Sequence, residues 1–285
     1  MNTNKVRIRL EELKELYDIG KKVSLITENR RATTLRSAEA EKIVEKVLLH
    51  CNSIIELFCI GLTDYTELDF ALIASAARNI MDCGNVYFYI SERGISEEEV
   101  NFRYNLQLLN YDKNIKDIFR KFGFPMDSFK MRLNYFSFVV KEIKDSSIYL
   151  NASNNEKSMI LSGKQFFKRK RVDIFSQDLE SAIFNMLSNS VHSFYIGLSN
   201  NSIKTPGVFA SFIDPLMLCI VSIETTLIYT ANILNDYLLL RRQLSKKVTK
   251  EERDKIKRLR SIEYLIDYLD IQKNEFDKDI FNTGF

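Results

Sequence analysis

Apolar residues recur every three or four positions along most of this chain, which is the spacing of one face of an α-helix. The pattern is clearest after Ser96, where three glutamates follow and Ser96 with Glu99 forms a capping-box sequence. Gly123 and Pro125 then interrupt the periodicity, as residues at the end of a helix do. We therefore predict a helix over about 97–122. Its apolar stripe consists of Val100, Tyr104, Leu108, Tyr111, Ile115, Ile118 and Phe122.

The same criteria predict a bundle of about eight helices. Asp214 followed by Pro215 is a strong helix start, and Thr249 with Glu252 is a second capping-box sequence. The expected fold class is therefore all-α. The predicted helices cover about 5–27, 37–62, 67–92, 97–122, 127–143, 176–198, 215–244 and, as the last one, 249–269.

One internal segment lacks helical periodicity. Residues 144–164 are polar and rich in serine and asparagine. We expect a long polar loop there, and such loops are usually functional or disordered. A short β-hairpin is the alternative, because 147–150 and 157–161 flank a turn-prone Asn-Ala-Ser-Asn-Asn sequence.

The composition agrees with long helices and few connections. The 285 residues include nine glycines and three prolines, too few for the many turns of a β-sandwich, barrel or propeller. No linker or internal repeat stands out, so we expect one helical domain over 1–285. Two histidines and four cysteines without a C-x-x-C pair form no zinc-binding pattern. No metal and no cofactor is therefore expected.

The charges are unevenly distributed although the net charge is only +3. Residues 241–260 carry ten basic against three acidic residues, and 261–285 carry two against six. Such basic clusters bind phosphate, an acidic partner or an anionic membrane, or they form a solvated helix face. A second basic cluster consists of Lys164, Lys168, Arg169, Lys170 and Arg171.

The apolar stretch 215–240 is about long enough to cross a bilayer. However, Glu224 and Asp236 lie inside it, and each acid would cost about 2.5–3.5 kcal/mol at the bilayer centre. A buried helix fits better, and membrane association is not expected. Because no signal-peptide pattern begins the chain, we expect a cytoplasmic protein.

Polar residues follow one face of the predicted helix 176–198. Asn185, Ser188, Asn189 and His192 are spaced by three and four residues. A histidine at the edge of the core can titrate near neutral pH and exchange protons with a substrate. The alternative is a structural histidine that is hydrogen-bonded to Ser188 or to a backbone carbonyl.

Two arginines are further candidates for a site. Arg78 and Asp82 are four residues apart on a helix with a small-residue centre, so Asp82 is one candidate partner for Arg78. A phosphate is the other, because a partly buried arginine needs an anionic partner. Arg103 lies on the next helix, and Glu224 is expected to pair with one of these arginines. His50 is expected to be a packing residue.

Three segments of the chain together resemble a group of prokaryotic all-helical proteins related to the HEPN superfamily. They read LIASAARNIMDCGNVYFYI, SEEEVNFRYNL and FNMLSNSVHSFYIGLS and lie within about 37–200. The resemblance implies a HEPN-like core over about 37–245, followed by a C-terminal region at 246–285. Many members of the group are linked to abortive infection. The positions that match its recurrent motifs are Arg78, Asp82, Arg103, Ser188 and His192.

One departure from the superfamily limits what the resemblance implies. Its ribonucleases carry an arginine a few residues before the histidine, whereas this chain has Asn185, Met186 and Leu187 there. Arg78 or Arg103 would have to supply that arginine from another helix. The implied reaction is metal-independent cleavage of RNA, in which His192 transfers the proton. The basic cluster from Lys164 to Arg171 would hold the RNA backbone.

Three functions are therefore considered. The first is an effector of a prokaryotic antiphage-defence or toxin system that acts on RNA. The second is a non-catalytic helical module that binds a protein partner or forms homo-oligomers, for which the oppositely charged C-terminal segments are suited. The third, a peripheral membrane effector, is disfavoured by Glu224 and Asp236.

Overall fold

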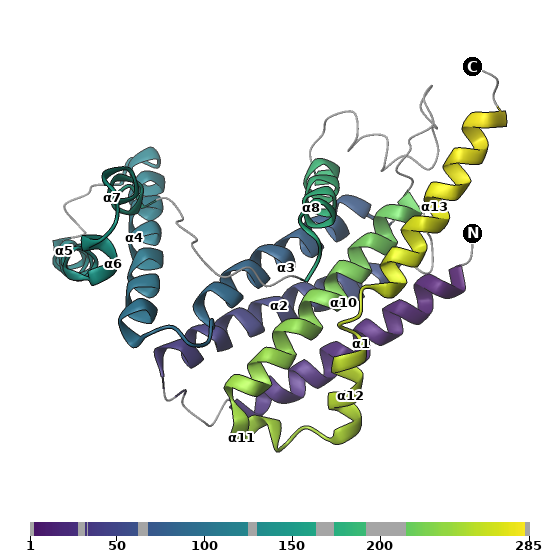
Figure 1. Ribbon diagram of the computed structural model, residues 1–285, viewed down its shortest axis with the longest axis horizontal. Coiled ribbons are helices and arrows are strands. Elements are labelled where there is room, and N and C mark those ends of the chain that lie inside the picture. The colour runs from purple at the N-terminus through teal and green to yellow at the C-terminus, as the bar shows by residue number, and fades with distance from the viewer. Residues whose placement is uncertain are drawn as a thin grey trace. The chain divides into compact units, whose positions relative to one another are not determined.

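In the residues that the computed structural model describes, helices are the only regular secondary structure (Figure 1), which confirms the all-α prediction. These residues are 3–27, 32, 34–61, 68–124, 130–163, 174–191 and 215–282. The longer helices are α1 (Thr3–Thr27), α2 (Leu35–Gly61), α3 (Phe70–Ile90), α4 (Glu97–Lys121), α5 (Lys130–Asp145), α8 (Gln177–Val191), α10 (Pro215–Leu240) and α13 (Glu263–Asn282). The shorter ones are α6 (Ser147–Leu150), α7 (Asn154–Leu161), α11 (Arg242–Ser245) and α12 (Lys250–Arg258).

The chain folds into two compact units. Unit 1 comprises Met1–Ala32, Ala40–Tyr87 and Val172–Phe285, and unit 2 comprises Thr33–Glu39 and Phe88–Arg171. Helices α2 and α3 continue from one unit into the other. Whether the two units behave as the single domain expected from the sequence stays a prediction.

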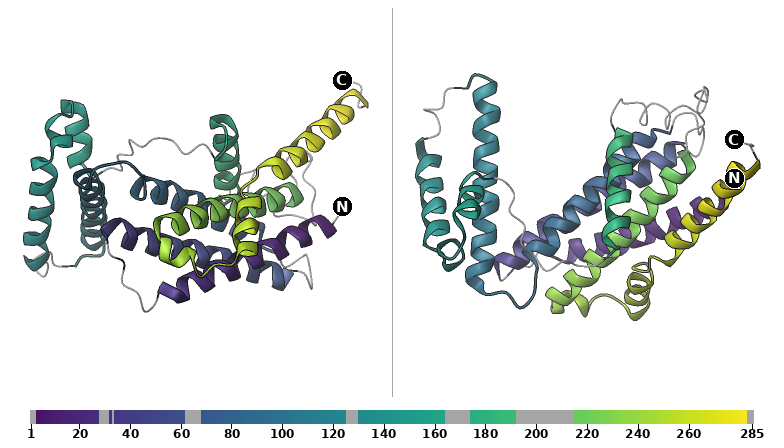
Figure 2. Two further views of the ribbon diagram at one scale, coloured as in Figure 1. Left: turned by 60° about the horizontal axis from the view of Figure 1, so that its bottom comes forward. Right: turned by 45° about the horizontal axis from the view of Figure 1, so that its top comes forward.

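Helix α10 forms the centre of unit 1 (Figure 1, Figure 2). Antiparallel to it lies α2, since Cys51 Sγ is 3.3 Å from Thr230 Oγ1 and Arg241 donates to Glu41 over 2.9 Å. Parallel to it lies α1, in which Arg9 pairs with Glu224.

The contact of α3 with α10 depends on a glycine. A Cβ atom at Gly84 would lie 2.5 Å from the ring of Tyr229, so only glycine lets the two helices approach this closely. Three residues further on, the Tyr87 hydroxyl donates to Asp236 over 3.1 Å. These contacts show that α3 runs parallel to α10 and therefore antiparallel to α2.

Its central position explains why α10 is apolar on all sides. The segment Leu216–Leu240 is apolar and long enough to cross a membrane, but 83% of its most apolar window is buried in the protein. Such burial is typical of the core helix of a bundle. The expected cytoplasmic location stays a prediction.

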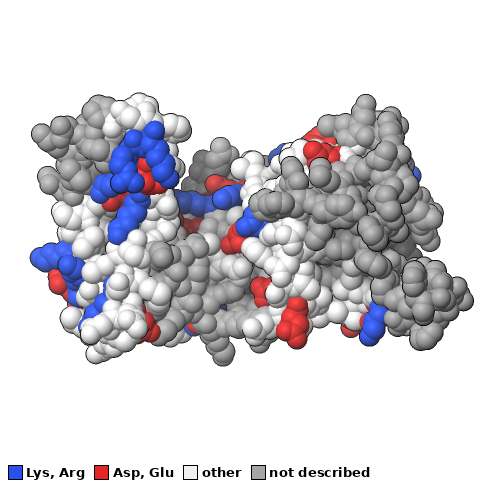
Figure 3. Space-filling view, turned by 90° about the horizontal axis from the view of Figure 1, so that it is seen from above, with Lys and Arg blue, Asp and Glu red and all other residues white. Residues whose placement is uncertain are grey.

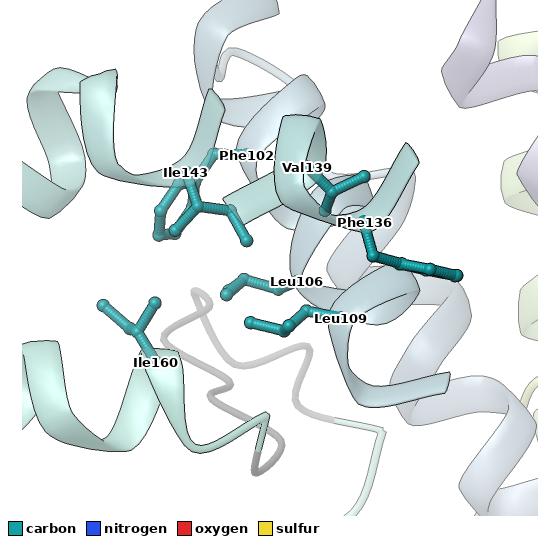
Figure 4. Packing of buried hydrophobic residues seen from close by; sticks show 7 residues of the cluster. All are labelled: Phe102, Leu106, Leu109, Phe136, Val139, Ile143 and Ile160. Carbon is teal, nitrogen blue, oxygen red and sulfur yellow. The ribbon is translucent and has the colours of Figure 1, made fainter. Parts of the chain in front are cut away.

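Unit 2 has a core of its own, formed where α4 packs against α5 and α7 (Figure 4). Apolar residues of α4 meet those of α5, and Ile160 reaches the same cluster from α7. Seven buried side chains form the cluster, namely Phe102, Leu106, Leu109, Phe136, Val139, Ile143 and Ile160.

The polar loop predicted over 144–164 is wrong for most of its length. The segment forms α6 and α7, and the alternative hairpin is not formed either. Ser146 caps α6, while Ser153 and Glu156 form a complete capping box at the start of α7. The serines that suggested a loop thus serve as helix caps.

The C-terminal region also differs from the prediction. Helix α10 ends at Leu240, because Arg241 has a non-helical backbone (φ −107°, ψ 66°). The capping box of Thr249 and Glu252 is confirmed, but it starts the short helix α12. The single helix expected over 249–269 is therefore two helices, α12 and α13, with a turn after Arg258.

Candidate functional site

The predicted catalytic residues fall into three groups in the structure. Arg78, Asp82 and Ser188 belong to unit 1, and Arg103 belongs to unit 2. His192 follows directly after α8 and lies outside the described residues. So do the predicted nucleic-acid-binding residues Lys164, Lys168, Arg169, Lys170 and Arg171.

Arg78 is a half-buried cation on α3 without a carboxylate partner. Its guanidinium lies 5.1 Å from the centre of the Phe184 ring on α8. Its Nε–H is buried and donates to no partner, and among the described residues Arg78 makes neither a hydrogen bond nor an ion pair. The ion pair with Asp82 that was one of the expectations is therefore not formed. Desolvation of such a cation costs free energy unless an anion binds it.

The charges around Arg78 come from α2 as well as α3. Burial of its carboxyl group raises the pKa of Asp82, while the charges of Arg78 and Lys46 oppose that rise. Burial also lowers the pKa of His50, and Lys46 adds to that effect. Lys46 on α2 thus acts on groups of both helices. We call Lys46, His50, Arg78, Asp82, Phe184 and Ser188 the Arg78 cluster.

His50 and Lys46 were not among the predicted site residues. They are four residues apart, so they share one face of α2. The Nε2 atom of His50 is buried without a hydrogen-bond partner, as is the hydroxyl of Ser188 on α8. The cluster therefore contains three buried polar atoms that lack partners, on Arg78, His50 and Ser188. A buried polar atom without a partner in a native protein is a candidate for binding a ligand or water.

The start of helix α8 is fixed to the core of unit 1. The Tyr229 hydroxyl donates to Glu180 over 3.0 Å, and Phe175 lies against the Tyr229 ring at 5.8 Å. These contacts hold the start of α8 in place and present Phe184 to Arg78.

Arg103 occupies a closed network in unit 2. It donates to Glu92 over 2.7 Å, to Glu99 over 2.5 Å and to the Tyr89 carbonyl, and its guanidinium stacks on the Tyr89 ring. Its side chain is only 4% exposed. Ser96 accepts from the Glu99 N–H as expected, but the Glu99 carboxylate binds Arg103. These contacts are typical of a structural arginine.

Glu224 pairs with Arg9 of α1, so the expected partners Arg78 and Arg103 are wrong. The Arg9 Nε and Nη2 atoms donate to the two carboxylate oxygens over 2.5 and 2.6 Å. Glu12 also binds Arg9, and the Tyr264 ring lies 4.7 Å from its guanidinium. The one acid that is fully buried in α10 is thus neutralised in the core of unit 1.

Part of the basic C-terminal segment binds acids of α1. Lys255 pairs with Glu15, and Arg258 pairs with Glu12 over 2.8 Å. One further pair has the basic residue on α1 and the acid on α12, since Lys22 pairs with Glu252 over 2.9 Å. These intramolecular pairs use charges that the sequence had suggested for oligomerisation, and the oligomeric state stays a prediction.

The lowered pKa of His50 predicts how stability depends on pH. The unfolded chain takes up a proton near pH 6.5, whereas native His50 resists protonation. The wild-type protein should therefore lose stability relative to His50→Gln as the pH falls below 6.5. Urea unfolding of both proteins at pH 7.5 and 5.5 measures the effect. A difference in unfolding free energy that stays constant between the two values would contradict it.

The described residues contain no group of three or more metal-ligating side chains. The Arg78 cluster contains two cations, an imidazole and a hydroxyl beside the Asp82 carboxyl group, and its two cations suit an anionic ligand. No family model, curated protein or solved structure matches this chain.

Proposed function

We propose that this protein acts on RNA as an effector of a prokaryotic antiphage-defence or toxin system, and that Arg78 binds a phosphate of the RNA. The observation that carries the proposal is the half-buried Arg78 without an anionic partner. A guanidinium matches two phosphate oxygens with its planar fork. Lys46 is exposed near the same site and adds positive charge.

The proposed reaction is metal-independent cleavage of a phosphodiester. The 2′-hydroxyl attacks the adjacent phosphorus, the bond to the 5′-oxygen breaks, and a 2′,3′-cyclic phosphate and a 5′-hydroxyl are formed. Arg78 would stabilise the charge that develops on the phosphate oxygens. The resemblance assigns the proton transfer to His192. His50 is less suited to it, since its Nε2 atom is covered by protein.

Cleavage of a labelled single-stranded RNA in the presence of EDTA tests the proposal. Arg78→Ala should reduce the rate at least about hundredfold, as the loss of a charge-stabilising donor does in other enzymes. Arg78→Lys should recover only part of the rate, since lysine lacks the planar fork. Arg242→Ala is the matched control, because Arg242 is an exposed arginine of the same unit. The Arg242→Ala variant should cleave the RNA at the wild-type rate.

Two results would count against the proposal. Equal rates for Arg78→Ala and Arg242→Ala would remove Arg78 from the reaction. The absence of cleavage by the wild-type protein would favour the alternative, a non-catalytic module of a defence complex. His192→Ala, measured alongside, tests the assignment of the proton transfer.

A further inference from the structure

Helix α4 ends in a cluster of three phenylalanines. Gly123 adopts a left-handed backbone (φ +75°), so that its N–H donates to the Arg120 carbonyl over 3.1 Å. The Phe124 N–H donates to the Phe119 carbonyl over 3.0 Å. These two bonds form a Schellman motif, which brings the rings of Phe119 and Phe124 to 5.4 Å. An apolar contact at that position is usual for this motif.

The side chain of Phe122 does not take part in the ring contact between Phe119 and Phe124. Its side chain is 74% exposed, and its ring stands nearly perpendicular to that of Phe124 at 6.4 Å. Burial of such a ring would be worth about 1.5–3 kcal/mol, which the isolated chain does not realise. Phe124 itself is 54% exposed. Two aromatic rings therefore face solvent side by side.

Cations flank these rings. Arg120 and Lys121 are both strongly exposed and share a single acid, Asp117, which Lys121 contacts over 2.6 Å. The end of α4 and the residues that follow it, 112–124, carry four basic and two acidic side chains, a net charge of +2. Lys and Arg side chains gather on the part of unit 2 at the left of Figure 3. The rings thus lie in a positively charged surrounding.

We infer that this aromatic end of α4 (Phe119, Arg120, Lys121, Phe122 and Phe124) binds single-stranded polynucleotide. Phe122 stacks on an unpaired base, and Arg120 and Lys121 bind the neighbouring phosphates. A protein partner fits less well, because lysine and aspartate are depleted at the centre of protein–protein interfaces, and Lys121 and Asp117 lie beside these rings. The inference goes beyond the proposed function, since base stacking requires no cleavage.

Fluorescence anisotropy with the full-length protein tests this inference. The probes are a labelled 20-nucleotide RNA, a DNA of the same sequence, and the RNA in duplex form. Phe122→Ala should weaken binding of both single strands about 5- to 100-fold, the effect of losing one stacked base. Phe122→Trp should preserve it. Phe138→Ala is the matched control, because Phe138 is a 57% exposed ring on α5 of the same unit.

Three outcomes would overturn the inference: no binding by the wild-type protein, equal losses for Phe122→Ala and Phe138→Ala, or tighter binding of the duplex. Circular dichroism confirms that each variant is folded. Binding that depends on Phe122 without any RNA cleavage would refute the proposed function but support this site. RNA cleavage that depends on Arg78, together with wild-type affinity of Phe122→Ala for single strands, would support the proposed function and refute this binding site.

Discussion

Arg9→Ala is expected to lower the free energy of unfolding by about 3–5 kcal/mol, the cost of removing one partner from a buried ion pair. Arg9 reaches from α1 to Glu224 of the central helix, and the Glu224 side chain is 1% exposed. Without Arg9, the carboxylate would be buried in an apolar surrounding with no counter-charge. Urea unfolding at pH 7 measures the loss.

Two comparisons separate this effect from a general weakening of α1. Arg7 is exposed on the same helix, so Arg7→Ala should change the unfolding free energy by less than about 0.5 kcal/mol. The double variant Arg9→Met, Glu224→Leu should recover most of the loss, because no buried charge remains. The loss in Arg9→Ala should also shrink at low pH, where Glu224 is protonated and easier to bury. Equal effects of Arg7→Ala and Arg9→Ala would contradict the argument.

Ile160→Ala should destabilise unit 2 by about 2–5 kcal/mol, as truncation of a large buried side chain usually does. Ile160 is completely buried and is the α7 member of the seven-residue core of unit 2, against which Leu161 also packs. Its loss would leave a cavity between α7 and the α4–α5 pair. Thermal unfolding combined with amide hydrogen exchange of α7 measures the effect.

Met159→Ala is the matched control for that substitution. Met159 is the preceding residue of the same helix and is 46% exposed, so its truncation should cost less than about 0.5 kcal/mol. If both variants lost the same stability, or if exchange in α7 stayed unchanged in Ile160→Ala, α7 would not be held by this core.

The fold could be predicted wherever a helix was long and its ends carried chemical signals. The helix predicted over 97–122 spans Glu97–Lys121, because Ser96 and Gly123 mark both ends. Helices α6 and α7 contain four and eight residues, too few for a periodic pattern to emerge. The S-x-x-E sequence of Ser153 and Glu156 was nevertheless present, and it was the signal that could have identified α7.

The candidate site was harder to predict because its residues come from different helices. Spacing along one helix suggested Arg78 with Asp82 but could not reveal that Lys46 of α2 lies close enough to act on Asp82. The same reason explains the wrong partner for Glu224, since Arg9 is 215 positions away along the sequence. Contacts between different helices depend on how the helices pack. The residue spacing in a single sequence does not predict that packing.

The position of α10 also determines the order in which the protein can be assembled during synthesis. Unit 2 is nearly continuous in sequence, so its core is complete once the ribosome has released residues up to α7. Unit 1 must wait for residues 215–240, because α1, α2 and α3 all pack against the helix that they form. At about 5–20 residues per second, the apolar faces of α1 to α3 stay uncovered for about 8–40 s. During that interval the nascent chain is most exposed to aggregation and most dependent on chaperones.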